Sequence, residues 1–341
     1  MRLLVTGHDG YIGAVMIPML QREGYEVVGL DSRFFHDCLF GEEPPDIPAV
    51  RKDIRDITAA DLHGFDAVLH LAALSNDPLG NLNPDLTYEI NHRGAVHLAE
   101  MAREAGVSRF LFSSSCSTYG AAGDAVLDEN ATFNPVTPYG KSKCLAEAGI
   151  AALAADDFSP VFLRNATAYG VSPRMRFDLV LNNLVAWAVT TGQVYIKSDG
   201  TPWRPIVHIE DIICAFIAVL QAPRESIHNQ AFNVGRNDQN YQVRDLATIV
   251  EQTVPGCHVE YAPGGEPDKR SYRVSFDKIH ACLPGFQPHW DARHGAEQLY
   301  ETYTHIGLQL DDFEGKRYRR IDHIRGLLES GLLDASLRWK H

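Results

Sequence analysis

Residues 3–13, LLVTGHDGYIG, decide the fold of this chain, because an apolar run leads directly into three regularly spaced glycines. The first four of these residues predict a buried strand, and a helix is predicted from Tyr11 onward. Gly7, Gly10 and Gly13 let the backbone turn tightly between the two and leave room for a diphosphate at the helix N-terminus. The stretch therefore predicts the first strand, turn and helix of a dinucleotide-binding fold.

Asp31 ends the next predicted strand, about 20 residues after the glycines, as in dinucleotide-binding units. A carboxylate at this position accepts hydrogen bonds from the adenosine ribose and repels the 2′-phosphate of NADP. Arg33 follows two residues later, and a guanidinium there can accommodate that phosphate. We therefore expect NAD as the cofactor, with NADP as the weaker alternative.

Strand and helix patterns alternate over the first 165 residues. Strands are predicted at Leu3–Thr6, Glu26–Asp31, Ala67–Ala72, Arg109–Ser114 and Pro160–Asn165. Helices are predicted at Tyr11–Glu23, Pro84–Ala105 and Pro138–Ala154. This alternation predicts an α/β protein with a Rossmann-like doubly wound parallel sheet.

The pattern loosens after residue 170, where short helical pieces and Gly/Pro-rich stretches follow. We expect an NAD-binding Rossmann domain at 1–170, to which 206–235 returns. A smaller interleaved C-terminal substrate-binding lobe is expected at 171–205 and 236–341. Its last residues, from Glu314 onward, predict a helical tail packed on the body or on a second subunit.

Composition limits the partners of the protein. The 341 residues include 31 Lys+Arg and 44 Asp+Glu, a net charge of −13 that disfavours nucleic acid. The longest apolar run, Ile212–Leu220, is too short to span a membrane. Glycines interrupt any signal peptide, the six cysteines lack paired spacing, and the histidines lack metal-ligand spacing. We expect a cytoplasmic protein with reduced thiols and no metal site.

Tyr139 and Lys143 stand four residues apart after a Thr-Pro pair that can begin a helix, so both lie on one helix face. An ammonium near the phenol favours phenolate and lowers its pKa from about 10. Such a pair alone is also compatible with a solvated helix face. Its position after the strand that ends in Ser113-Ser114-Ser115 favours an acid/base pair instead, with Ser115 placed to bind the hydroxyl being oxidised.

With these motifs in this order, the chain resembles an extended short-chain dehydrogenase/reductase of the nucleotide-sugar epimerase/dehydratase family. Nearly the whole length is similar, and the further matching motifs are Asp53-Ile54, His70–Ala73, Asn91, Ser113–Gly120, Arg164 and Arg204–Asp211. The resemblance implies that Ser115, Tyr139 and Lys143 are catalytic. Implied cofactor-binding residues are Gly7, Gly10, Tyr11, Ile12, Gly13, Asp31, Ser32, Asp53, Ile54, Leu71, Ala72, Ala73, Asn91, Ser113, Tyr139 and Lys143. Implied substrate-binding residues are Ser75, Cys116, Ser117, Thr167, Asn182, Arg204 and Arg270, the two arginines on the substrate diphosphate.

Two positions depart from the family pattern. Family members that dehydrate the sugar share an Asp-Glu pair at the positions where this chain has Cys116 and Ser117. A thiol is a weak proton shuttle unless its pKa is lowered, and a small buried residue is the alternative role for Cys116. Many members also carry Asn where this chain has Thr167, so the substrate cannot be carried over from the family.

We therefore expect an NAD-dependent epimerase that acts on a nucleoside-diphosphate sugar through a transient 4-keto sugar. Three alternatives stay open: a keto-sugar reductase with dissociable NAD(P)H, a dehydratase that uses Cys116, and a non-catalytic NAD(P)-binding sensor protein. The resemblance also implies a homodimer that pairs through the predicted helices Pro84–Ala105 and Pro138–Ala154.

Overall fold

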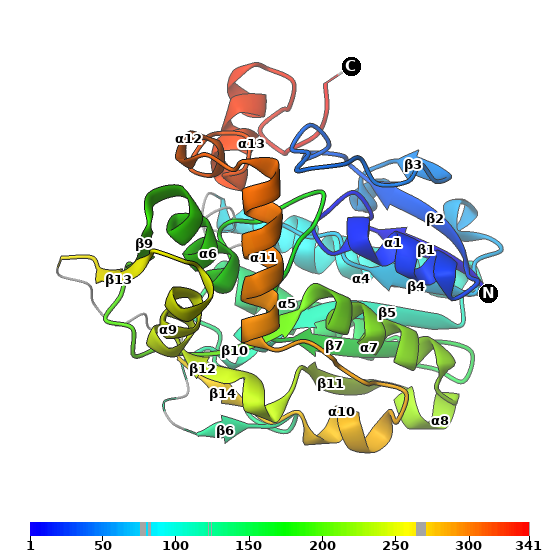
Figure 1. Cartoon of the computed structure of the whole chain (residues 1–341). Coiled ribbons are helices and arrows are strands. Elements are labelled where there is room, and N and C mark those ends of the chain that lie inside the picture. Colours follow the sequence, from blue (N-terminus) through cyan, green and yellow to red (C-terminus); the bar gives the residue numbers. More distant parts are fainter. Residues whose placement is uncertain (76–79, 81–82, 122, 124, 264–270, 341) are drawn as a thin grey trace.

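The computed structural model describes residues 1–75, 80, 83–121, 123, 125–263 and 271–340 (Figure 1). Its strands are β1 (Arg2–Thr6), β2 (Glu26–Asp31), β3 (Ala49–Arg51), β4 (Ala67–His70), β5 (Arg109–Ser115), β6 (Val126–Leu127), β7 (Ser159–Asn165), β8 (Thr167–Tyr169), β9 (Gln193–Ile196), β10 (Trp203–His208), β11 (Gln230–Val234), β12 (Asn240–Gln242), β13 (His258–Tyr261) and β14 (Arg273–Val274).

The α-helices are α1 (Gly13–Arg22), α3 (Pro84–Tyr88), α4 (Ala95–Glu104), α5 (Pro138–Ala151), α6 (Val180–Thr191), α7 (Ile209–Gln221), α8 (Arg224–Ile227), α9 (Val243–Thr253), α10 (Asp277–Cys282), α11 (Ala292–Ile306), α12 (Leu310–Phe313) and α13 (Arg320–Glu329). Shorter helical turns are η1 (Ile54–Asp56), η2 (Ala59–Leu62), η3 (Glu89–Gly94), η4 (Cys116–Tyr119) and η5 (Asn237–Gln239).

A parallel sheet of seven strands forms the centre of the molecule, in the order β11-β7-β5-β4-β1-β2-β3. The chain starts in the middle and winds outward in both directions, which is the order of a doubly wound Rossmann-like sheet. The predicted fold class is confirmed. Because β1 lies at the point where the winding reverses, the turn after it opens at the carboxyl edge, where such sheets bind ligands.

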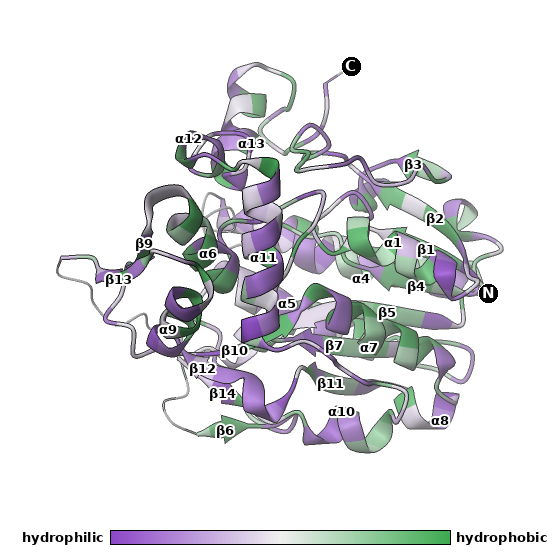
Figure 2. Ribbon diagram, in the orientation of Figure 1, coloured by the Kyte–Doolittle hydropathy of each residue, from purple (hydrophilic) through white to green (hydrophobic). Residues whose placement is uncertain are grey.

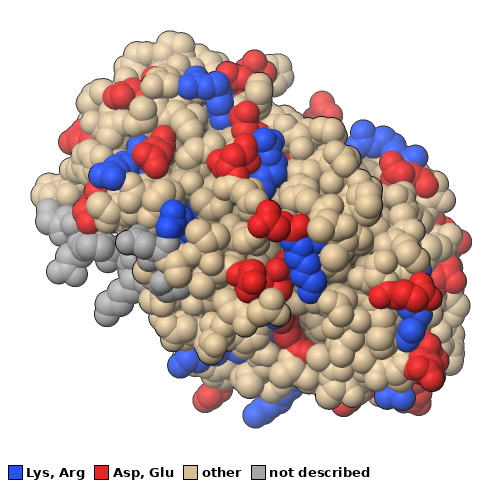
Figure 3. All heavy atoms as spheres, turned by 90° about the horizontal axis from the view of Figure 1, so that it is seen from below, with Lys and Arg blue, Asp and Glu red and all other residues tan. Residues whose placement is uncertain are grey.

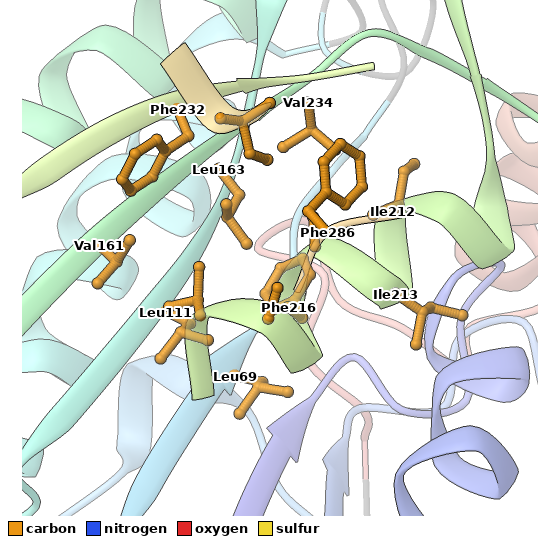
Figure 4. Close-up of a cluster of buried hydrophobic side chains, with 14 of the residues drawn as sticks. Leu69, Leu111, Val161, Leu163, Ile212, Ile213, Phe216, Phe232, Val234 and Phe286 are labelled. Atoms are coloured by element: carbon orange, nitrogen blue, oxygen red, sulfur yellow. The ribbon is translucent and has the colours of Figure 1, made fainter. Parts of the chain in front are cut away.

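Helices cover both faces of this sheet, which is why the middle of its central strands is apolar (Figure 2). On one face, Ile212, Ile213 and Phe216 of α7 pack on Leu111 and Leu163 of the strands (Figure 4). On the other face, the buried side chains of α4 and α5 pack in a second core that includes strand residues of β4, β5 and β7. Burial of both faces fixes the strand ends that carry the site.

The region expected as one helix, Pro84–Ala105, contains the π-helical turn η3 between α3 and α4. The predicted helix is confirmed from Pro84 to Glu104, but its π-helical turn was not predicted, because an apolar pattern of helical period does not reveal where one residue is added to a turn. The turn includes Asn91, whose side chain bonds the backbone of Leu74 rather than facing solvent.

A smaller set of elements lies beside the carboxyl edge of the sheet. It contains the three-stranded sheet β12-β10-β8, the strand pair β13-β9, and helices α6, α9 and α11, which pack on one another (Figure 1). The chain enters it after β7 and leaves it after β10 for α7, which covers the large sheet, and then for β11, which joins that sheet beside β7. The tail with α13 returns to the large sheet's side, where Ile324 is fully buried.

Acidic and basic side chains are interspersed on the face seen in Figure 3, so the net negative charge is not gathered there. Among the described residues, no helix is both long and apolar enough to cross a bilayer.

Candidate active site

A cavity of about 700 Å³ opens where β1, β2, β4 and β5 end. The predicted site residues that line it are Gly7, Gly10, Tyr11, Ile12, Gly13, Asp31, Ser32, Asp53, Ile54, Leu71, Ala72, Ala73, Ser75, Ser113, Ser115, Ser117, Tyr139, Lys143, Thr167 and Arg204. Asn91, Cys116 and Asn182 do not line it, and Arg270 lies outside the described residues. The structure therefore brings most of the predicted cofactor, catalytic and substrate residues into one space.

The turn after β1 is shaped by two glycines that admit no side chain. Gly7 has φ +76°, and a Cβ there would lie 2.7 Å from the backbone nitrogen of Ala72. A Cβ on Gly13 would lie 2.2 Å from the carbonyl oxygen of Gly7. Only glycine lets α1 begin this close to the turn, so its first amide groups face the cavity as a dinucleotide diphosphate requires.

Asp31 lies at the end of β2 and is held by the backbone. Its carboxylate accepts hydrogen bonds from the backbone nitrogens of Arg33 (2.7 Å) and Asp9 (3.1 Å). Burial raises the pKa of Asp31, and these two bonds oppose that effect. The remaining lone pairs are available for ribose hydroxyls, and Arg33 is not among the described residues that line the cavity. This arrangement fits NAD better than NADP.

Asp53 and Ile54 form the wall that faces Asp31 at the end of the cavity where the adenosine is expected. Asp53 caps η1 through a hydrogen bond from the backbone nitrogen of Arg55 (2.9 Å), and the Arg55 guanidinium lies 2.6 Å from the same carboxylate. Although burial alone would raise it, the pKa of Asp53 is lowered by these hydrogen bonds. The wall is therefore held by bonds within the protein itself.

Tyr139 and Lys143 project from α5 into the other end of the cavity. The helix begins as predicted, with Pro138 in its first turn and the Thr137 hydroxyl accepting a hydrogen bond from the Gly140 backbone (3.2 Å). The Lys143 ammonium lies 5.8 Å from the centre of the Tyr139 ring. A cation at this range favours the phenolate form of the tyrosine.

Lys143 is almost completely buried, with 3% of its surface exposed. Its Nζ donates a hydrogen bond to the carbonyl oxygen of Ser113 (2.7 Å). Burial lowers the pKa of Lys143 to about 7, against an ordinary value of 10.5, and nearby Glu147 partly offsets this. Strand β5 thus holds the Lys143 amino group at the cavity by one hydrogen bond.

Ser115 ends β5 beside this pair. Its Oγ accepts hydrogen bonds from the backbone nitrogen (3.1 Å) and the hydroxyl (2.8 Å) of Ser117. Its own hydroxyl hydrogen remains available to donate to a ligand oxygen. A donor at a strand end, next to a phenol and an ammonium, is suited to stabilise negative charge that develops on a sugar oxygen.

Asn91 and Asn182, both predicted as ligand contacts, hold cavity walls from behind. Asn91 exchanges hydrogen bonds with the backbone of Leu74 (2.8 and 3.0 Å) and donates to Ser142 on α5 (3.2 Å). Asn182 donates to the Tyr11 hydroxyl (3.1 Å). The adjacent residue of α6, Asn183, lines the cavity in its place.

A buried ion pair fixes α5 on the sheet one turn beyond Lys143. The Arg164 guanidinium, at the end of β7, lies 2.8 Å from the Glu147 carboxylate, which also accepts a hydrogen bond from Ser114. Because both charges are buried, removing one partner would leave the other uncompensated. The pair therefore sets the register between the helix that carries the tyrosine and the strand that carries the serine.

Cys116 is fully buried in the core beneath the cavity. Its Sγ donates to the carbonyl oxygen of Arg164 (3.1 Å), and burial raises the pKa of the thiol well above its usual range. The structure therefore supports the small buried residue that was the alternative role for Cys116. Its neighbour Ser117 lines the cavity.

Sequence reasoning missed two arginines that line the cavity, Arg176 and Arg320. Arg176 forms a two-pronged ion pair with Asp178 (2.7 and 3.0 Å) and lies 3.4 Å from the Ser75 hydroxyl. Arg320 comes from the start of α13 in the tail. Neither stands in a motif or a periodic pattern, so no sequence signal marked them.

The sequence profile of the NAD dependent epimerase/dehydratase family matches residues 3–235. The UDP-glucose 4-epimerase of Lactobacillus helveticus is 28% identical over an alignment of 297 residues that covers 79% of this chain and 87% of that enzyme. The UDP-glucose 4-epimerase of Corynebacterium glutamicum is 27% identical over 323 residues, covering 90% and 97%. The structure of MoeE5 in complex with UDP-glucuronic acid and NAD is 28% identical with a TM-score of 0.78, covering 90% of this chain and 100% of MoeE5.

The chain therefore belongs to the NAD dependent epimerase/dehydratase family. It is an NAD-dependent enzyme of that family, with an extended short-chain dehydrogenase/reductase fold. The comparisons confirm the family, the fold, the enzyme class and the NAD cofactor that the sequence predicts.

Proposed function

We propose that the enzyme inverts C4 of a nucleoside-diphosphate sugar through a transient 4-keto sugar. The observation that carries this proposal is that Ser115, Tyr139 and Lys143 line the same cavity as the glycine turn and Asp31. The curated relatives named above are UDP-glucose 4-epimerases, which agrees with this reaction.

Each side chain of the trio has a defined task. Tyr139, as phenolate, takes the proton of the sugar hydroxyl and later returns it. Lys143 favours the phenolate by its charge and donates to a ribose, and Ser115 donates to the oxygen on which negative charge develops. Bound NAD supplies a hydride acceptor that can return the hydride to either face of the keto sugar.

The buried thiol argues against the dehydratase alternative. Dehydration needs a group that exchanges a proton with the sugar carbon, and Cys116 neither lines the cavity nor ionises readily. The sensor alternative is disfavoured because all three catalytic side chains line the cavity.

We propose a UDP-linked hexose or hexuronate as the substrate. Arg204, Arg176 and Lys197 add cations at the end of the cavity formed by the smaller lobe. Arg204 and Arg270 are proposed to bind the substrate diphosphate, as the resemblance implies. MoeE5 was solved with UDP-glucuronic acid and with UDP-glucose, which supports this substrate class.

The test is to incubate the purified enzyme with UDP-glucose or UDP-glucuronic acid and to identify the product by NMR. We expect the C4 epimer, no accumulation of reduced nicotinamide, and no solvent deuterium in the sugar. Stoichiometric oxidation of added NADH would favour the reductase alternative instead. Deuterium incorporated next to the oxidised carbon would favour the dehydratase.

We further propose a cytoplasmic homodimer that pairs through α3, α4 and α5. In support, Leu145 and Val136 are each 45% exposed, and a surface depression of about 640 Å³ lies on this face. All six cysteines are free, as expected in a reducing compartment. Leu145→Glu should convert the dimer to a monomer in light scattering, and an unchanged mass would refute this interface.

We also propose that 1–170 with 206–235 binds the cofactor, and that 171–205 with 236–341 forms the substrate lobe and tail. Residues of both parts line the cavity, and β11 joins the large sheet, in agreement with this division.

A further inference from the structure

The C-terminal segment 316–340, which we call the strap, lies far beyond the part of the chain that matches the family profile. It is anchored by Ile324, Leu333 and Leu337, which are nearly fully buried in the core on the α4 and α5 face of the sheet. Figure 1 shows α13 and the end of the chain next to the loop that follows β2. The strap is thus an integral part of the fold.

The strap holds one wall of the adenosine end of the cavity, formed by Ser32, Phe34 and Phe35. Trp339 Nε1 donates to the carbonyl oxygen of Ser32 (2.6 Å). His323 Nε2 donates to the carbonyl oxygen of Phe34 (2.8 Å). These bonds hold the backbone of the wall and do not involve the side chains of Ser32 and Phe34.

The strap also reaches the opposite wall, which begins at Asp53. The Arg55 guanidinium, which pairs with Asp53, donates to the carbonyl oxygen of Ser336 (3.0 Å). Arg338 forms an ion pair with Asp56 at the end of η1. One segment therefore ties together the two walls between which the adenosine must lie.

Arg320 is the strap residue that lines the cavity itself. Its guanidinium lies 4.1 Å from the Phe35 ring centre, and its Nε is buried without a hydrogen bond partner among the described residues. Burial and the nearby Arg176 lower the pKa of Arg320 to about 10, which leaves it charged at neutral pH. A half-buried guanidinium that lines the cavity is suited to a phosphate oxygen.

The place of Arg320 indicates which phosphate it meets. Arg176, Asp178 and Asp31, which also line the cavity, are close enough to Arg320 to interact with its charge. Asp31 marks the adenosine ribose, and the trio with Tyr139 marks the nicotinamide end, so the cofactor diphosphate lies between them. We propose that Arg320 binds the diphosphate of NAD and that the strap is a built-in part of the cofactor site. The proposal rests on NAD occupying this cavity and is independent of the sugar that is epimerised.

The test measures binding rather than turnover, by calorimetry on cofactor-stripped protein with NAD and, separately, with UDP. Arg320→Gln should weaken NAD at least tenfold and leave UDP affinity within twofold, and Arg320→Lys should be intermediate. Arg319→Gln is the matched control. Arg319 is the adjacent residue, and its guanidinium pairs with Asp322 on the outside of the helix. Trp339→Phe removes the bond to Ser32 but keeps an aromatic ring beside Phe34 and Arg51, and it should speed NAD release severalfold.

Unchanged NAD affinity in Arg320→Gln, with native circular dichroism, would overturn the proposal. Weakened UDP binding with unchanged NAD would also overturn it, by assigning Arg320 to the substrate diphosphate. If Arg320→Gln does not fold, Arg320→Lys and Trp339→Phe decide, and wild-type NAD binding in both would refute the strap's role. Failure of the wild-type protein to bind NAD would instead contradict the cofactor itself.

Discussion

The two ends of the cavity are built in different ways. At the catalytic end, Ser115, Tyr139 and Lys143 face the ligand directly, and α5 is fixed from behind by the buried pair Glu147–Arg164. At the adenosine end, the walls are held through backbone carbonyls by a segment from the other terminus of the chain.

This difference follows from what each end must do. Proton transfer needs particular side chains at particular positions, because only certain groups have a usable pKa. Holding an adenosine needs walls of fixed shape, and backbone hydrogen bonds from many sequences can supply them. Substitutions at the catalytic end should therefore change rates, and substitutions at the adenosine end should change cofactor affinity and selectivity.

Of the substitutions that separate rate from cofactor affinity, Tyr139→Phe should have the largest effect. The ring stays in place, but no group remains to take the hydroxyl proton, so kcat should fall about 10³-fold. NAD affinity, measured by calorimetry, should stay within about threefold, since the phenol is not needed to hold the walls. Tyr25→Phe, outside the cavity, is the control. Near-normal turnover would show that another base acts.

Lys143→Met should lower kcat about 10²-fold, because the phenolate then lacks its cation. The same change tests the burial of the ammonium. Lys143 has a pKa near 7 when folded and near 10.5 when unfolded, so the unfolded chain binds more protons between these values. Wild-type stability should therefore rise with pH across this window, by up to about 1 kcal/mol per pH unit from this group.

The Lys143→Met variant has no titrating amine at this position and so lacks this pH-dependent contribution to the unfolding free energy. The difference in unfolding free energy between variant and wild type should be most favourable to the variant near pH 7 and should shrink toward pH 10, in urea titrations of cofactor-free protein. A difference that does not change with pH would mean that Lys143 is hydrated in solution, against its 3% exposure.

Asp31→Ser should act on selectivity at the adenosine end. Removing the carboxylate loses hydrogen bonds to the ribose and removes repulsion of a 2′-phosphate, so the ratio of NAD to NADP affinity should shift toward NADP by about tenfold. The rate with saturating NAD should change little. Asp37→Asn, an exposed carboxylate in the following loop, is the control. An unchanged ratio would mean that Asp31 does not face the ribose.

The large sheet could be predicted because β-strands that alternate with crossover helices leave few arrangements, and the glycine turn gives the first of them. Residues at strand ends, such as Ser115 and Asp31, were predictable for the same reason: parallel strands end at one edge. The π-helical turn at Glu89–Gly94 was not predictable, because it adds one residue to a turn without changing the apolar pattern of the helix.

Physical reasons also limit how far the site residues can be predicted from the sequence. Neighbouring helix residues point about 100° apart, so Asn182 and Asn183 cannot be told apart by sequence when the orientation of α6 is unknown. Arg320 reaches the cavity only because the tail folds back across the whole chain, and contacts of such long range leave no local pattern. The adenosine end is for this reason the less predictable of the two.

Cys116→Ser should have the smallest effect and gives the sharpest test of where the catalytic end stops. Cys116 follows Ser115 in sequence, yet its Sγ points into the core and donates to the Arg164 carbonyl, a bond that a serine hydroxyl can replace. We expect kcat within about twofold of wild type, because no step of epimerisation uses this thiol. Unfolding should become easier by about 1 kcal/mol, since a more polar group is buried.

If instead Cys116→Ser abolished turnover in a folded protein, while solvent deuterium entered the wild-type product, the thiol would be the proton shuttle of a dehydratase. Burial alone argues against this, because a shuttle must ionise within reach of the sugar, and burial raises the pKa of this thiol. Ser117 lines the cavity one residue further along, so Ser117→Ala is the matched comparison. A loss of activity in Ser117→Ala but not in Cys116→Ser would place the boundary of the catalytic end between these two neighbours.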